Sequence, residues 1–219
     1  MGATALWLDL DGTLIDTWRR HWRAYLNACA ALKMAPGSFA RFKTLKRRGP
    51  RAADALIAGL NLRQKDRFRS VQKAWIEHPS LLALDRPFPG TQEFLRWAGL
   101  RFEVHLATSR TSEAKALHQL DSLGLRGHFR RVVVTNGASG RPRDKATLAR
   151  SQKGATLWVG DTEAEAFAAR AAKAPFFACS RGIRERAILL GLGPAAVFSN
   201  YAALRRALAP LATPKTSGR

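Results

Sequence analysis

The chain has 219 residues, of which 46% are hydrophobic, and it carries 37 Lys and Arg against 16 Asp and Glu, a net charge of +21. Its length and apolar fraction are typical of a globular protein with one domain, or one domain with an insertion, and exclude a disordered chain. No run approaches the roughly 20 apolar residues of a membrane helix. Asp9 interrupts the first apolar run, and only two cysteines are present, so we expect a cytoplasmic protein with no signal peptide and no disulfide framework.

The positive charge favours anionic partners such as polyanions, anionic lipid or anionic substrates. A basic surface that only aids solubility accounts for the charge equally well. The basic residues are concentrated between positions 17 and 86, where 16 Lys and Arg stand against 4 Asp and Glu.

Short apolar runs alternate with helical patterns along most of the chain. Several of the apolar runs are apolar on both faces, as in a parallel sheet that helices cover on both sides. The alternation predicts an α/β fold with a doubly wound parallel sheet, whose ligands bind beyond the carboxyl ends of the strands. The predicted strands are 3–8, 102–108, 131–135, 155–160 and 175–179, and the predicted helices are 91–98, 112–123, 145–151, 163–173, 182–190 and 200–208.

The interval between the first two predicted strands is too long for a single crossover. It contains stripes of apolar residues at helical spacing, from Trp18 to Leu32 and from Phe68 to Trp75, which predict a small helical bundle with an aromatic core. We therefore expect an inserted helical cap and a flexible C-terminal tail. The predicted division is 1–16 and 87–210 for the core, 17–86 for the cap and 211–219 for the tail.

Two carboxylates follow the first predicted strand in the stretch LWLDLDGTLIDTW. Asp9 ends the strand, Asp11 follows two residues later, and Gly12 permits a tight turn. Acids this close repel each other and suit a divalent cation such as magnesium, which prefers oxygen ligands. A simple turn rich in Asp and Gly has the same composition, so the other strand ends must decide between the two interpretations.

Polar side chains also follow three other predicted strands. Thr108 ends the second strand, Lys145 opens the helix after the third, and Asp161 ends the fourth. Each is explained by an ordinary helix terminus when taken alone. Together with the two acids they converge on one crevice at the carboxyl edge of the sheet, which is a much stronger signal than any of them alone.

These motifs resemble the haloacid dehalogenase superfamily, subfamily I, with a C1-type cap inserted after the first motif. The resemblance covers residues 3–208 and rests on DLDGTLID, on Thr108 after VHLA, on Lys145, and on VGDTEAE with Asp161. It implies a magnesium-dependent phosphatase similar to phosphoglycolate phosphatases, although a mutase that uses the same pair of acids stays open.

The resemblance also implies a role for each matched residue. Asp9 would attack phosphorus and form an aspartyl-phosphate, while Asp11 would act as general acid and base. Asp9, Asp161 and the carbonyl of Asp11 would hold Mg²⁺. Thr108 and Lys145 would neutralise the phosphoryl oxygens.

Two positions depart from the family pattern. Glu165 stands where a second Asp is usual, and it would either reach magnesium through water or hold Lys145. Arg141 is an alternative to Lys145, because the third motif often reads Lys-Pro and Arg141 precedes Pro142.

The substrate is predicted only by class. Lys46 and Arg47, in a basic stretch of the cap, are hypothesised to bind a second anionic group of a small phosphorylated metabolite, although a solvated helix end is an equal alternative. Two further functions stay open: a phosphatase for nucleotides or nucleic-acid ends, and a non-catalytic basic protein that binds nucleic acid. The oligomeric state is not predicted.

Overall fold

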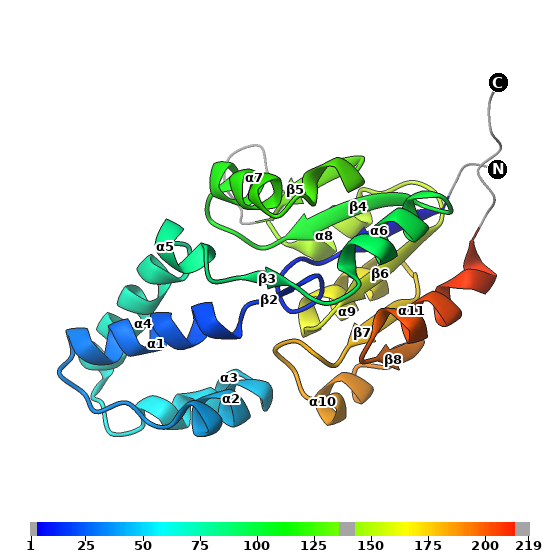
Figure 1. Ribbon diagram of the computed structural model, residues 1–219. Coiled ribbons are helices and arrows are strands. Elements are labelled where there is room, and N and C mark those ends of the chain that lie inside the picture. Colours follow the sequence, from blue (N-terminus) through cyan, green and yellow to red (C-terminus); the bar gives the residue numbers. More distant parts are fainter. Residues whose placement is uncertain (1–3, 136–142, 213–219) are drawn as a thin grey trace.

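A computed structural model describes residues 4–135 and 143–212. Within these residues a six-stranded, wholly parallel sheet has the order β5-β4-β1-β6-β7-β8 (Figure 1). Each predicted apolar run contains a strand, and the doubly wound α/β prediction is confirmed. The strands are β1 (Ala5–Leu8), β4 (Glu103–Thr108), β5 (Arg131–Val134), β6 (Thr156–Gly160), β7 (Phe176–Cys179) and β8 (Ala196–Phe198).

Alternating side chains of the strands bury two separate cores. Leu6 and Leu8 of β1 face one core, whereas Trp7 faces the other. Helices α6 (Thr91–Gly99), α7 (Glu113–Ser122) and α11 (Tyr201–Leu208) cover the first core. Helices α8 (Lys145–Arg150), α9 (Glu163–Ala171) and α10 (Arg186–Leu190) cover the second. Short 3₁₀ turns lie at Arg126–His128 (η2) and Ala209–Leu211 (η3).

Two details of the sheet differ from the sequence prediction. Strand β8 was not predicted, because three residues after Gly193 and Pro194 are too few to show an alternating pattern. The helix predicted over 182–190 begins only at Arg186, after Glu185 as N-cap, and the preceding residues form a loop. This loop contacts the end of β6, because the backbone N–H of Ile183 donates a hydrogen bond to the Asp161 carboxylate.

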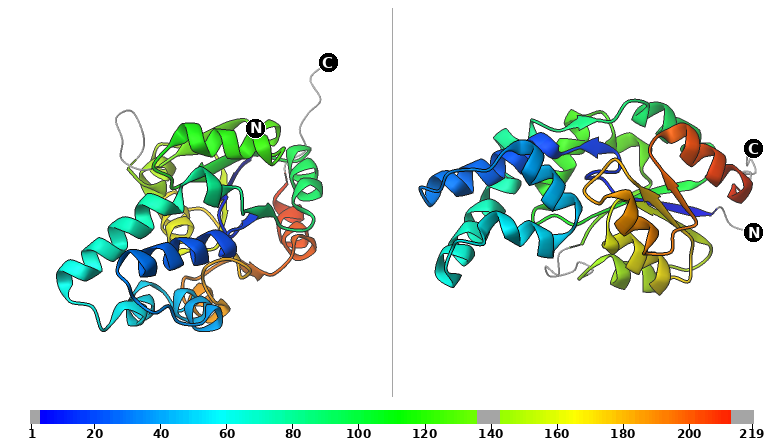
Figure 2. Two further views of the ribbon diagram at one scale, coloured as in Figure 1. Left: turned by 60° about the vertical axis from the view of Figure 1, so that its left-hand side comes forward. Right: turned by 90° about the horizontal axis from the view of Figure 1, so that it is seen from below.

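The segment of the chain between β1 and β4 consists mainly of helices. Most of these helices lie together at one end of the molecule, beside the sheet (Figures 1 and 2). The chain leaves through β2 (Ile15–Asp16) and returns through β3 (Arg86–Pro87), which pair antiparallel. The helices between them are α1 (Trp18–Ala31), α2 (Phe39–Arg47), α3 (Pro50–Ala53), α4 (Leu62–Ile76) and α5 (Pro79–Leu82), with the 3₁₀ turn η1 (Asp54–Ile57).

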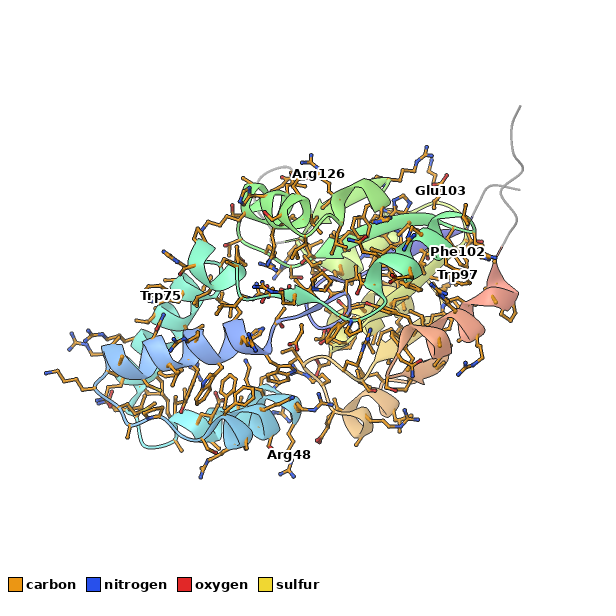
Figure 3. All side chains as sticks on the ribbon, viewed as in Figure 1. Arg48, Trp75, Trp97, Phe102, Glu103 and Arg126 are labelled. Atoms are coloured by element: carbon orange, nitrogen blue, oxygen red, sulfur yellow. The ribbon has the colours of Figure 1, made fainter. Side chains whose placement is uncertain are left out.

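Aromatic side chains form the centre of this helical segment. Tyr25 and Phe42 have ring centroids 5.0 Å apart, and Phe68 lies 5.9 Å from Tyr25. These rings pack with Trp18 in one buried cluster, as the apolar stripes predicted. Trp75 is an exception, since 36% of its surface is exposed (Figure 3).

Candidate active site

The loop after β1 is held rigidly to the neighbouring strand. The N–H of Asp9 donates to the carbonyl of Val159 at 2.9 Å, so β1 and β6 present their ends together. Gly12 adopts a φ of +78°, and the N–H groups of Thr13, Leu14 and Ile15 all donate to the carbonyl of Leu10. This compact turn places Asp9 and Asp11 at the carboxyl edge of the sheet.

Asp9, Lys145 and Glu165 form a buried group of three charges. The Lys145 Nζ lies 2.5 Å from Asp9 Oδ1 and also donates to Glu165 Oε1. All three side chains are less than a tenth exposed. Burial lowers the pKa of Lys145, but the two carboxylates outweigh it and raise that pKa above its usual range. Lys145 therefore stays protonated.

Burial has the opposite effect on the carboxylates of this edge. It raises the pKa of Asp9, and the charges of Glu165 and Asp11 add to that rise while Lys145 opposes it. Burial likewise raises the pKa of Asp161, helped by the negative charges of Asp9 and Glu165. These carboxylates lack sufficient positive charge around them among the described residues.

Helix α9 fixes the position of Glu165. Thr162 is the N-cap, and its N–H and hydroxyl donate to Glu165 Oε2 at 3.1 and 2.8 Å in a capping box. The other carboxylate oxygen is thereby turned toward Lys145. Of the two roles considered for Glu165, this contact corresponds to holding Lys145.

Asp161 is completely buried at the end of β6. Its Oδ2 accepts a hydrogen bond of 2.5 Å from the N–H of Ile183, while its Oδ1 has no partner among the described residues. Glycines 12 and 182 crowd this side chain so closely that a Cβ on either would overlap it. The backbone thus fixes one oxygen of Asp161 and leaves the other available to a ligand.

The residues at this edge fit a single divalent cation held mainly by two carboxylates and water. No group of three or more His, Cys, Asp or Glu side chains within 4–135 and 143–212 is placed to hold a metal. Asp161 Oδ1 is unpaired, however, and Asp9 Oδ2 receives only a long bond of 3.4 Å from Thr13 in this part of the chain. Two such oxygens are hard donors of the kind Mg²⁺ binds, and Mg²⁺ usually retains several waters.

Asp11 does not share the environment of Asp9. Its Oδ1 lies 2.6 Å from Arg110 Nη2, and its Oδ2 lies 2.8 Å from Arg20 Nη2. Burial opposes ionisation of Asp11, but Arg110 and Arg20 outweigh it and hold the pKa of Asp11 below its ordinary value. In this arrangement Asp11 is an anion with no proton to donate. We call Arg20 and Arg110 the arginine pair.

Two further polar side chains, Asp85 and Gln119, contact the arginine pair. Arg20 Nε lies 3.3 Å from Asp85 Oδ2, and Arg110 Nη2 donates to Gln119 Oε1 at 2.9 Å. Gln119 Nε2 donates in turn to Asp85 Oδ2 at 2.8 Å. Arg20 belongs to α1 and Asp85 precedes β3, so this buried network joins both connections of the helical segment to the sheet.

The other predicted residues lie around the same edge. Thr108 ends β4, is 1% exposed, and accepts a hydrogen bond from the N–H of Thr135 through its carbonyl. Lys46 is half-buried, and burial together with Arg184 lowers its pKa. Arg47 donates to the carbonyls of Gly182 and Ser180 at 2.8 and 3.0 Å. Arg141 lies outside the described residues.

Comparison with known proteins places the chain in a family of hydrolases. The family model described as haloacid dehalogenase-like hydrolase matches residues 6–179, which include every motif at the sheet edge. The chain belongs to the haloacid dehalogenase-like hydrolase family. It is 28% identical over 215 residues to a phosphoglycolate phosphatase of Mesorhizobium japonicum, and the match covers 92% of each chain.

Solved structures share the fold of this chain. A haloacid dehalogenase-like hydrolase of Streptococcus pneumoniae has a TM-score of 0.76 at 17% identity, covering 93% of this chain and 97% of that one. A hydrolase of Pseudomonas syringae has a TM-score of 0.67 at 22% identity, covering 96% and 100%. In the present chain, the helical insertion between β2 and β3 is consistent with a cap. The described residues contain no helix with the length and hydrophobicity of a membrane span.

Sequence reasoning missed the arginine pair of this family member. Arg110 stands two residues after Thr108, so a cation next to a predicted phosphate ligand was an available signal. Arg20 carries no such signal, because it lies within a basic helical stretch and only the fold brings it to Asp11. No sequence pattern predicts the contacts of Gln119 and Asp85 with the arginine pair either.

Proposed function

We propose that this hydrolase is a magnesium-dependent phosphatase that hydrolyses a small anionic phosphomonoester through an aspartyl-phosphate on Asp9. The observation that carries the proposal is the placement of Asp9. One of its oxygens is paired with Lys145 and the other receives only a long bond from Thr13 within the described chain. The likeness to the Mesorhizobium enzyme supports phosphoglycolate or a similar compound as the substrate class.

In the proposed reaction Asp9 attacks phosphorus as the bond from phosphorus to the leaving oxygen breaks. Asp11, after it has left Arg20 and Arg110 and taken up a proton from solvent, passes that proton to the leaving oxygen. Asp11 then takes a proton from the water that attacks phosphorus, phosphate is released, and Asp11 gives the proton to solvent when it returns to the two arginines. Lys145 and Thr108 neutralise the phosphoryl oxygens during both steps.

Asp9, Asp161 and the carbonyl of Asp11 would hold Mg²⁺, with Glu165 fixing Lys145 beside them. The bound cation supplies positive charge that offsets the buried carboxylates and the phosphoryl oxygens. The raised pKa values of Asp9 and Asp161 support this assignment, because both acids need a further cation to remain ionised together.

Residues 17–86 act as the cap in this proposal, closing over the sheet edge and excluding water from the phosphoryl group. Lys46 is a cap residue proposed to contact the substrate, since its ammonium has no carboxylate partner in the described structure and Arg184 is the charge that, with burial, lowers its pKa. The two free cysteines, both buried, are consistent with the proposed cytoplasmic location.

The test is release of phosphate from a panel of phosphomonoesters with and without Mg²⁺. We expect hydrolysis of a short anionic substrate that EDTA abolishes and that Asp9→Asn removes. Asp121→Asn is the matched control, because Asp121 is exposed, pairs with Arg126 and belongs to none of the motifs. Unchanged hydrolysis in Asp9→Asn would refute the proposal. Binding of nucleic acid with steep salt dependence and no hydrolysis of any ester would favour a binding protein instead.

A further inference from the structure

The proposed reaction gives the arginine pair no role other than its contact with Asp11. Arg20 is 1% exposed and Arg110 is 3% exposed, whereas the Asp11 side chain between them is 25% exposed. Asp11 therefore covers two guanidinium groups at the edge of the sheet. Only by displacing Asp11 would another anion reach both groups.

Each guanidinium group has a partner other than Asp11. Asp85 lies 3.3 Å from Arg20, and Gln119 accepts from Arg110 at 2.9 Å. Gln119 also donates to Asp85 and, at 3.1 Å, to the carbonyl of Leu82. None of these contacts involves Asp11. This network contains two cations and one carboxylate, so departure of Asp11 leaves a preformed buried cradle for an anion.

The reaction proposed above requires Asp11 to leave this cradle, because the arginine pair holds both of its carboxylate oxygens, at 2.6 and 2.8 Å, and leaves neither to reach the leaving oxygen. The departure would expose buried positive charge unless an anion replaces Asp11. A substrate with a second anionic group supplies that anion. The exchange trades one carboxylate for another, and it leaves the charge of the cradle unchanged.

We propose that the arginine pair binds the carboxylate of the leaving group, and that this carboxylate displaces Asp11 and frees it for the leaving oxygen. The inference rests on the proposed function and narrows its substrate class. The leaving oxygen must face Asp11, so an anion that takes the place of the Asp11 carboxylate lies close to that oxygen. A phosphorylated 2-hydroxycarboxylate meets this requirement, because its carboxylate is bonded to the same carbon that carries the ester oxygen. A sugar phosphate presents neutral hydroxyls there.

The first experiment compares two esters of equal length. The substrates are 2-phosphoglycolate, which carries the carboxylate, and ethyl phosphate, which does not. In Arg20→Gln and in Arg110→Gln, we expect kcat/KM for 2-phosphoglycolate to fall at least about tenfold more than kcat/KM for ethyl phosphate. Arg69→Gln is the control, since Arg69 is an exposed cap residue paired with Asp54, and it should change neither value.

An equal loss on both esters would overturn the inference, because it would mean that the arginine pair only positions Asp11. Hydrolysis of neither ester, nor of any other in the panel, by the unaltered enzyme would overturn the proposed function and this inference with it. The two failures are therefore distinguishable.

A binding measurement avoids any change to the buried arginines. In Asp11→Ala the cradle is open, so glycolate should bind at least about tenfold more tightly than it binds the unaltered enzyme, as measured by calorimetry at constant ionic strength. The additional loss of Arg20 in Asp11→Ala/Arg20→Gln should abolish that gain. Equal affinity of the unaltered enzyme and Asp11→Ala for glycolate would contradict the exchange.

Discussion

Single residues at the sheet edge divide the charges of this hydrolase into two groups. Lys145 is shared by Asp9 and Glu165, while Asp11 is shared by Arg20 and Arg110. The two acids stand only two residues apart in the sequence, yet Asp9 shares a single ammonium with Glu165, whereas Asp11 is paired with two guanidinium groups. This difference suits the roles proposed above, with Asp9 as the nucleophile beside a metal site and Asp11 as an acid that is released when substrate binds.

Gly182 tests how strictly the backbone fixes Asp161. A Cβ at position 182 would overlap the Asp161 side chain, whereas Gly59 has no atom within 4 Å of such a Cβ. We expect Gly182→Ala to lower kcat/KM about 100-fold and to weaken the Mg²⁺ dependence, because small displacements of site groups are costly. Gly59→Ala should retain activity. Full activity of Gly182→Ala would show that Asp161 has freedom to move.

The residue scale also shows what sequence reasoning can reach. Lys145 was placed beside Asp9 from its position at a helix start, and the structure brings the two within hydrogen-bonding distance. Residues that share a strand end are predictable because the topology alone unites them. Arg20 reaches Asp11 from the helical segment, and no pattern in the chain encodes how that segment docks.

At the scale of elements, β1, β4 and β6 bury an aromatic stack on the face covered by α8 and α9. Trp7 lies 4.6 Å from His105 and 5.5 Å from Trp158, measured between ring centroids. His105 is 4% exposed. Burial and the nearby Arg131 lower the pKa of His105 to about 4, against the opposing charge of Glu103.

The lowered pKa of His105 predicts acid sensitivity. The neutral ring is favoured in the folded state, so its contribution to stability is complete above pH 6.5 and is lost as the pH falls from 6.5 toward 4. Between these limits the free energy of unfolding should fall by about 3 kcal/mol more than in His105→Phe. Urea unfolding across this pH range measures the difference. Parallel curves for the two proteins would contradict the assignment.

Elements were predictable where they are long or central, and not where they are short or recruited by the site. The buried strands β1 and β6 show nearly continuous apolar runs, and α9 shows a capping box. Strand β8 is a three-residue edge strand. Residues 182–185 have helical composition, but Ile183 donates its N–H to Asp161 and Arg184 donates to Glu163, so tertiary contacts replace a helical turn.

The whole molecule is held in its present arrangement by contacts between the helical segment and the sheet. Arg47 donates to the carbonyls of Ser180 and Gly182, and Arg184 donates to the carbonyl of Lys46 at 3.1 Å. On the opposite side, Glu77 accepts from the N–H and hydroxyl of Thr111 at 2.8 and 2.7 Å. Both sets of contacts border the edge that carries Asp9.

Substitution of Arg47 tests whether these contacts hold the helical segment, the proposed cap, against the sheet. Arg47→Met removes two charged hydrogen bonds, so we expect faster hydrogen exchange over 180–185 and a KM about tenfold higher. Arg48→Met is the matched control, because Arg48 is exposed and points away from the sheet (Figure 3). Unchanged exchange over 180–185 in Arg47→Met would show that the cap is held by other contacts.

Covalent trapping tests the central claim most directly. The enzyme is mixed with 2-phosphoglycolate and Mg²⁺, quenched rapidly in acid, and reduced with borohydride, which converts an aspartyl-phosphate to homoserine. Peptide mass spectrometry should then find homoserine at position 9 and not at position 11. Turnover of the substrate with homoserine at neither position, or at position 11 alone, would contradict the assignment of Asp9 as the nucleophile.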